Sequence, residues 1–79
     1  MNDEKRELKA LQMQIAKAIG KRIKSERIAR GWTAYRLAKE SELTAPHIER
    51  IESGKIAPRV DIITRLCLAL NIEISLPIA

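Results

Sequence analysis

Cysteine and aromatic residues are scarce in this chain of 79 residues, which contains one Cys, one Trp, one Tyr and no Phe. A lone cysteine, Cys67, excludes an intrachain disulfide and offers no metal-binding spacing, so it is expected to be a small core residue. Two rings are too few for a platform of exposed aromatics that stacks the bases of single strands or RNA.

Long apolar runs are also missing. No stretch approaches the roughly 18 residues of a membrane-spanning helix. The first segment, MNDEKRELKA, carries charges of both signs where a signal peptide would be apolar. There is no glycine-rich phosphate loop, no HExxH motif and no evident pair of catalytic carboxylates. We therefore expect a cytoplasmic protein that is not an enzyme, needs no cofactor or metal, and does not bind a membrane.

The charge balance is basic, with 15 Lys and Arg against 10 Asp and Glu and a net charge of +5. In so small a chain this excess suggests a polyanionic partner, although it could serve solubility alone. The length is that of one domain, residues 1–79, with a real but modest core.

Residues 3 to about 29 are predicted to form one long helix or two abutting helices, which the left-handed residue Gly31 would end. Apolar residues recur along it in steps of three and four, at Leu8, Leu11, Ile15, Ile19 and Ile23. A helix of this length, ~40 Å, is longer than a compact core requires. Its first turns should therefore project, and they would either pack on a partner subunit or fray.

Two short helices are predicted between Thr33 and Gly54, joined by a tight turn around Glu42. Thr33 and Thr44 are suited to the N-cap positions, and Gly54 is suited to end the second helix. The outer face of the second helix is polar. Such a pair is typical of a helix-turn-helix, in which the second helix enters a DNA groove.

A fourth helix is predicted over residues 60–70, followed by the alternating segment IEISL at 72–76. Ile72, Ile74 and Leu76 would share one face of a β-strand. A lone strand is not stable in water, so pairing with its own copy across a two-fold axis would make the protein a homodimer. The alternative is a packed or disordered tail.

At this point the chain resembles the XRE/Cro family of helix-turn-helix proteins, which includes phage repressors. The matching stretches are RIKSERIARGWTAYRLAKE (22–40), LTAPHIERIESGK (43–55), and Pro58 with LCLALN (66–71). The resemblance implies an all-α, four- to five-helix, lambda-repressor-like domain whose third helix lies in the major groove. Its core would be residues 19–71, with a helical extension at 1–18 and a dimerisation segment at 72–79.

The family's DNA-contacting positions fall on Ala34, Thr44, Ala45, Pro46, His47, Arg50 and Lys55. The nearby residues Thr33, Arg36 and Arg59 are further candidates for phosphate contact. Ala34, Ala45 and Pro46 replace polar readers, and Glu42 replaces the usual glycine of the turn. Base reading therefore narrows to His47 and Arg50. Arg50 could instead pair with Glu49, and His47 could be an ordinary surface residue.

The resemblance also pairs Arg27 with Glu52 in an ion pair that holds the first helix to the end of the third. The tail is similar to the C-terminal strand of HipB-like antitoxins. The leading hypothesis is a homodimeric repressor that binds double-stranded DNA at a palindromic operator. The alternatives are an antitoxin, which neutralises a toxin protein and regulates its own operon, and a pure dimerisation adaptor.

Overall fold

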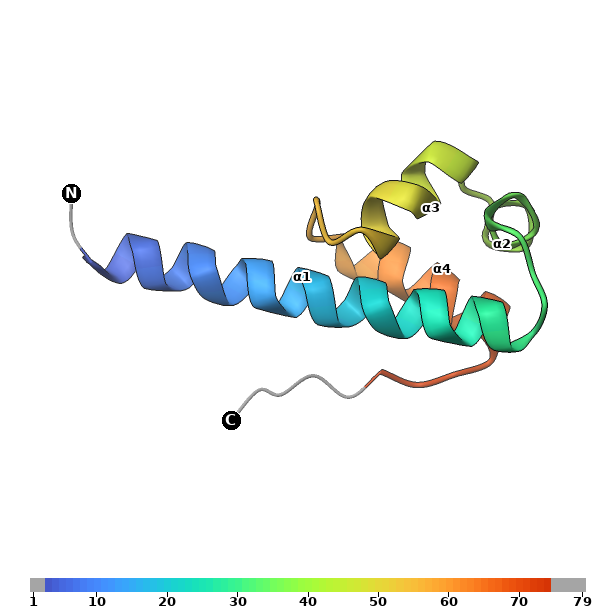
Figure 1. Cartoon of the computed structure of the whole chain (residues 1–79), viewed down its shortest axis with the longest axis horizontal. Helices are drawn as coiled ribbons and strands as arrows, with labels where there is room; N and C mark the ends of the chain where they lie inside the picture. Colours follow the sequence, from blue (N-terminus) through green and yellow to red (C-terminus); the bar gives the residue numbers. More distant parts are fainter. Residues whose placement is uncertain (1–2, 75–79) are drawn as a thin grey trace.

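Residues 3–74 are described by the structure, a computed structural model, and this part of the chain is all-helical. The four helices are α1 (Asp3–Ala29), α2 (Ala34–Ser41), α3 (Ala45–Glu52) and α4 (Val60–Leu70). The helix α1 runs the length of the molecule, and the other three gather over its C-terminal half (Figure 1). The expected all-α fold of four to five helices is confirmed, with four helices in these residues.

The core lies where α2, α3 and α4 meet the C-terminal half of α1. Its fully buried large side chains are Ile23, Leu37, Ile48, Ile51, Leu66 and Leu70. They come from all four helices at the three- and four-residue steps of amphipathic helices, so their burial is the main force that assembles the domain.

Gly20 allows α1 and α3 to approach closely. A Cβ atom at this position would lie 2.8 Å from the carbonyl oxygen of Glu52 and closer still to that of Ile51. The sequence suggests only that Gly20 interrupts a helix, at a cost of ~1 kcal/mol relative to Ala. The structure gives the residue a packing role that offsets this cost.

A left-handed residue follows each of the four helices. These residues are Gly31, Glu42, Gly54 and Asn71, with φ angles of 69°, 59°, 75° and 56°. Glu42 therefore adopts the turn conformation that the family supplies with glycine, and for a residue with a Cβ this costs about 1–2 kcal/mol. The turn is closed by the N–H of Leu43, which donates to the Ala38 carbonyl over 2.8 Å.

The first half of α1 lies beyond the core, as its length predicts. Residues 3–14 are all exposed. Leu8 and Leu11 continue the apolar stripe of the helix but remain 62% and 50% exposed. In the described chain nothing covers this end of the stripe.

The predicted strand is not formed where the tail is described, at residues 72–74. The N–H of Ile72 donates instead to the Cys67 carbonyl, over 3.0 Å, and caps α4. Ile72 and Ile74 are half-buried against the helical core. A strand needs a neighbouring strand for its hydrogen bonds, and within this chain Ile72 and Ile74 make apolar contacts with the core instead. Leu76, the third residue of the predicted pairing face, lies outside the described residues.

Candidate nucleic-acid interface

Two threonines set the starts of α2 and α3 in the same way. The Thr33 hydroxyl accepts a hydrogen bond from the Arg36 N–H at 3.0 Å, and the Thr44 hydroxyl accepts one from the His47 N–H at 3.3 Å. Each cap satisfies a backbone donor that the first turn of a helix would leave unpaired. Both N-cap predictions are confirmed, and the start of α3 is fixed locally by its own sequence.

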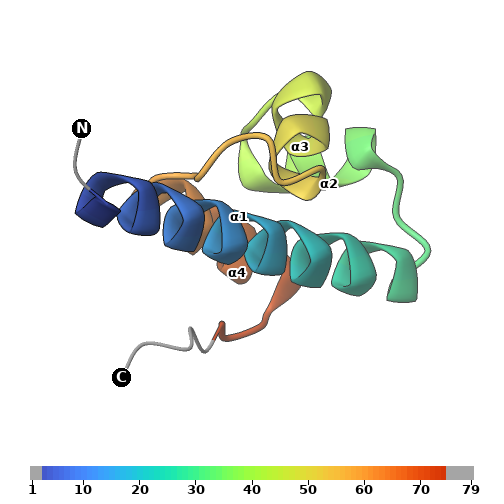
Figure 2. The same cartoon turned by 60° about the vertical axis from the view of Figure 1, so that its left-hand side comes forward.

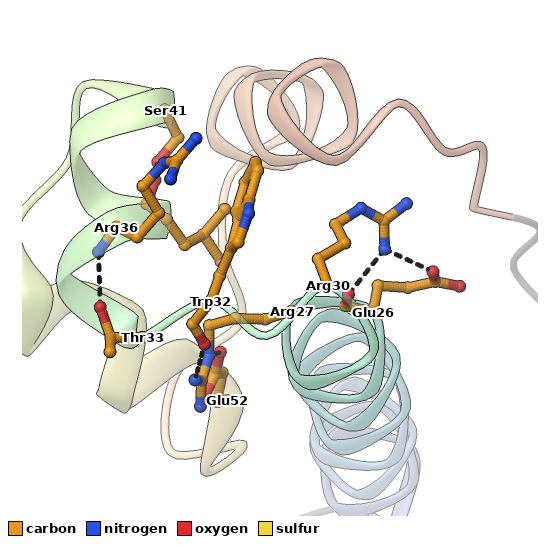
Figure 3. A network of polar contacts seen from close by, with 9 residues as sticks. Glu26, Arg27, Arg30, Trp32, Thr33, Arg36, Ser41 and Glu52 are labelled. Atoms are coloured by element: carbon orange, nitrogen blue, oxygen red, sulfur yellow. Dashed lines mark hydrogen bonds and ion pairs between the residues drawn. The ribbon is translucent and has the colours of Figure 1, made fainter.

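The end of α3 is fixed by Arg27 of α1. Arg27 donates to both carboxylate oxygens of Glu52, from Nε at 2.7 Å and from Nη2 at 2.9 Å. Its Nη1 donates to the Trp32 carbonyl at 2.8 Å (Figure 3). The hydrogen bonds to Glu52 raise the pKa of Arg27 above its usual value. These are the two residues that the family resemblance pairs, and together they set the orientation of α3 on α1.

The outward side of α3 presents a polar surface, which we call the α3 face. It consists of Pro46, Glu49, Arg50 and Ser53, with Lys55 from the following loop, and these residues line a shallow hollow. All five side chains are exposed. In residues 3–74 no ion pair engages Arg50, and neighbouring Glu49 does not bond to it. The guanidinium is therefore presented to solvent.

Two of the predicted contact residues of α3 are less accessible. Ala45 is half-buried and packs against the core. His47 is also half-buried and lines a separate hollow with Pro58 and Arg59. Since Pro46 has no N–H and the His47 N–H is bonded to Thr44, the start of α3 has few backbone donors left for a phosphate.

Arg59 and Arg36, the other two arginines predicted to contact phosphate, are each paired with a carboxylate. Arg59 lies 3.3 Å from the carboxylate of Asp61, and both side chains are largely exposed. Arg36, at the start of α2, pairs with Glu40 at 3.0 Å and lies over the Trp32 ring, 4.7 Å from its centre (Figure 3). The beginning of α2 therefore carries an oriented cation, while neighbouring Ala34 is half-buried against the core.

A further contact, between the end of α1 and the end of α4, was not predicted from the sequence. Arg30 donates to the Leu70 carbonyl at the end of α4, and to the backbone carbonyl and carboxylate of Glu26. Its sequence signal is weak, because a basic residue at the C-terminal end of a helix more often serves only the helix dipole.

These elements form a helix-turn-helix domain. It consists of α2 with its threonine cap, the left-handed turn at Glu42, and α3 with its outer face exposed. The helix-turn-helix family matches residues 23–76, and the chain belongs to this family.

A solved structure shares the fold, namely the clp gene regulator ClgR from Corynebacterium glutamicum. The TM-score is 0.70 at 24% sequence identity, over 73% of this chain and 62% of that one. This chain therefore spans less than two thirds of the length of that regulator. No curated protein matches the sequence.

Two other kinds of site are not formed by residues 3–74. No group of three or more His, Cys, Asp or Glu side chains there is arranged to hold a metal ion. No helix there is long and apolar enough to cross a membrane.

Burial raises the pKa of the half-buried Cys67 thiol, which makes it a weaker nucleophile at neutral pH.

Proposed function

We propose that this protein is a homodimeric repressor that reads a palindromic operator with α3 in the major groove. The observation that carries the proposal is the α3 face. It is solvent-exposed, its helix is held by Thr44 at one end and by Arg27 at the other, and it presents an arginine without an ion pair in the described chain. An α-helix fits the major groove, and a fixed helix can bring the same side chains to the same bases at each binding event.

The residues would divide the work by their chemistry. Arg50 would read a guanine edge through its two-pronged guanidinium. Lys55, Arg59 and Arg36 would contact phosphates, which adds affinity without sequence preference. The hydroxyls of Thr33 and Thr44 accept bonds from the backbone, and each can still donate its proton to a phosphate.

His47 and the small residues have narrower roles in this proposal. The half-buried position of His47, beside Arg59, favours a phosphate contact at the rim over base reading. Pro46 is exposed and could touch a thymine methyl group, while Ala34 and Ala45 mainly support the packing of α2 and α3. Base specificity then depends largely on Arg50.

In this proposal the two subunits of the dimer contact each other through the C-terminal segment, residues 72–79. Ile72 and Ile74 are only half-buried, so each leaves apolar surface for a second copy. Two subunits would set their α3 helices about one DNA turn apart, ~34 Å, and this spacing calls for a palindrome. Such a protein acts on the chromosome, in the cytoplasm. The antitoxin alternative depends on the likeness of the tail alone, and no feature of residues 3–74 favours it over the repressor.

Salt-titrated binding to a duplex selected from a random-sequence library tests the division of roles. Arg50→Ala should cost about 1–3 kcal/mol on the selected sequence and relax its specificity. Lys55→Ala should weaken all duplexes alike and flatten the salt dependence. If both variants bind selected and unselected duplexes as the wild type does, α3 is not the reading helix.

A further inference from the structure

Basic side chains of α1 form a row that runs from the projecting half of the helix into its packed half. Arg6, Lys9 and Lys17 are exposed and follow one another at helical spacing, with Met13 between the last two. At 3.6 residues per turn, these positions fall on one side of the helix. Glu4, Glu7, Leu8 and Leu11 line a hollow on the opposite side. We call the side formed by Arg6, Lys9 and Lys17 the α1 basic face.

Two close contacts fix the direction of this face. Gly20, which continues the same series of positions, lies under the last carbonyls of α3. The stem of Lys17 packs on Gly54, since a Cβ there would lie 2.7 Å from Lys17 Cγ and 3.1 Å from Lys17 Cα. The α1 basic face is therefore turned to the side of the molecule that carries α3 and the α3–α4 connection, which lie on the same side of α1 in Figure 2.

The α1 basic face continues the α3 face. Lys17 contacts Gly54, and the next residue, Lys55, lines the hollow of the α3 face together with Arg50. From Lys17 back to Arg6 the helix extends ~16 Å at 1.5 Å per residue. That length matches about five base pairs of duplex at 3.4 Å each. A row of cations of this length, adjoining a DNA-reading surface, is complementary to a phosphate backbone.

We propose that the α1 basic face binds the sugar-phosphate backbone of DNA flanking the sequence that α3 reads. This proposal rests on the proposed function, because it requires α3 to face a duplex. It assigns the helical extension to binding the same DNA molecule outside the operator half-site. The first half of α1 is already nucleated by its packed second half, so it reaches the flank as preformed helix.

The test compares two variants of the full chain with equal net charge. The first, Arg6→Gln/Lys9→Gln/Lys17→Gln, removes three charges from the basic face and lowers the net charge from +5 to +2, since 5 − 3 = 2. The second, Leu8→Glu/Leu11→Glu/Ala18→Glu, adds three negative charges on the opposite side and also reaches +2, by the same arithmetic. Circular dichroism checks that α1 stays helical in both.

Binding is measured against salt concentration on two duplexes, one trimmed to the selected site and one extended by ten base pairs on each side. The plot of log affinity against log salt should lose about 0.9 of slope for each phosphate contact removed. On the extended duplex, the first variant should therefore lose a slope of about 2 to 3, and the second should keep most of the wild-type slope. On the trimmed duplex, which lacks the flanking phosphates, the salt slopes of the wild type and the first variant should differ much less.

Equal slopes for the two variants on the extended duplex would overturn the α1 interface, while wild-type binding to the selected site would leave the proposed function intact. A wild-type chain that binds no duplex in a salt-dependent way would overturn both. The two failures are therefore distinguishable.

Discussion

The two halves of α1 have similar sequences and different surroundings. Both carry the same three- and four-residue apolar repeat, and both are mixed in charge. Ile19 and Ile23 in the second half are at most 3% exposed, while Leu8 and Leu11 in the first half are at least 50% exposed. Periodicity therefore predicts that a segment is helical and which side is apolar, but not whether another element will cover that side.

The largest expected difference between the halves is in the cost of removing an apolar side chain. Ile23→Ala leaves a cavity among fully buried neighbours and should lower the free energy of unfolding by about 2–5 kcal/mol. Leu11→Ala, its counterpart in the exposed half, should cost below ~0.5 kcal/mol. Urea denaturation measures both. A Leu11→Ala cost comparable to that of Ile23→Ala, growing with protein concentration, would show that a second copy covers the first half.

A smaller difference between the halves is expected for substitutions where the backbone of α1 lies close to another helix. Gly20→Ala adds a methyl group where α3 carbonyls leave no room, so it should destabilise the fold by about 1–3 kcal/mol. Gln14→Ala, on the exposed half, should be neutral within about 0.5 kcal/mol. Thermal unfolding of the two variants decides the matter. If Gly20→Ala instead stabilises by the ~1 kcal/mol that helix propensity alone would give, the close approach of α1 and α3 is wrong.

The smallest effect is electrostatic and concerns acid stability. Hydrogen bonds from Arg30 and then Arg22 lower the pKa of Glu26, in the packed half, below its usual value. Its contribution to stability is therefore present above the unfolded-state pKa and is lost as the pH falls through the lowered folded-state pKa. Glu26→Gln should flatten the acid side of the stability profile slightly.

Glu7→Gln controls for the loss of one carboxylate on the exposed half. Unfolding midpoints followed from pH 7 to pH 3 compare the two variants. Profiles that coincide would mean that the Glu26 ion pairs contribute nothing in solution.

Local signals predicted most of the helix-turn-helix. Thr33 and Thr44 cap the two helices because a threonine hydroxyl satisfies the backbone donors of a first turn, and this needs no distant partner. Gly31 and Asn71 end their helices because these residues tolerate left-handed backbone. The start of α4 has no such signal, because Arg59 makes no side-chain cap hydrogen bond.

The features that the sequence did not disclose depend on contacts across the chain. Gly20 matters because the end of α3 lies on it, and Arg30 matters because it reaches the end of α4. Apolar and polar residues alternate in the tail as they would in a strand. Ile72 and Ile74 nevertheless pack against the core, because the chain turns there to cap the end of α4. In the candidate site, Arg50 and Lys55 line the same hollow, as the prediction requires. Ala34, Ala45 and His47 are half-buried, which reduces the surface that each can offer to DNA.

The central claim is that DNA meets the outward side of α3, and mapping of backbone amide shifts by NMR tests it most directly. A mixed-sequence duplex is added to the isotope-labelled protein at low salt. The largest shifts should fall on residues 45–55, and Thr64 and Leu68 on the outer side of α4 should stay unchanged. Shifts concentrated on α4, with none on α3, would contradict the account.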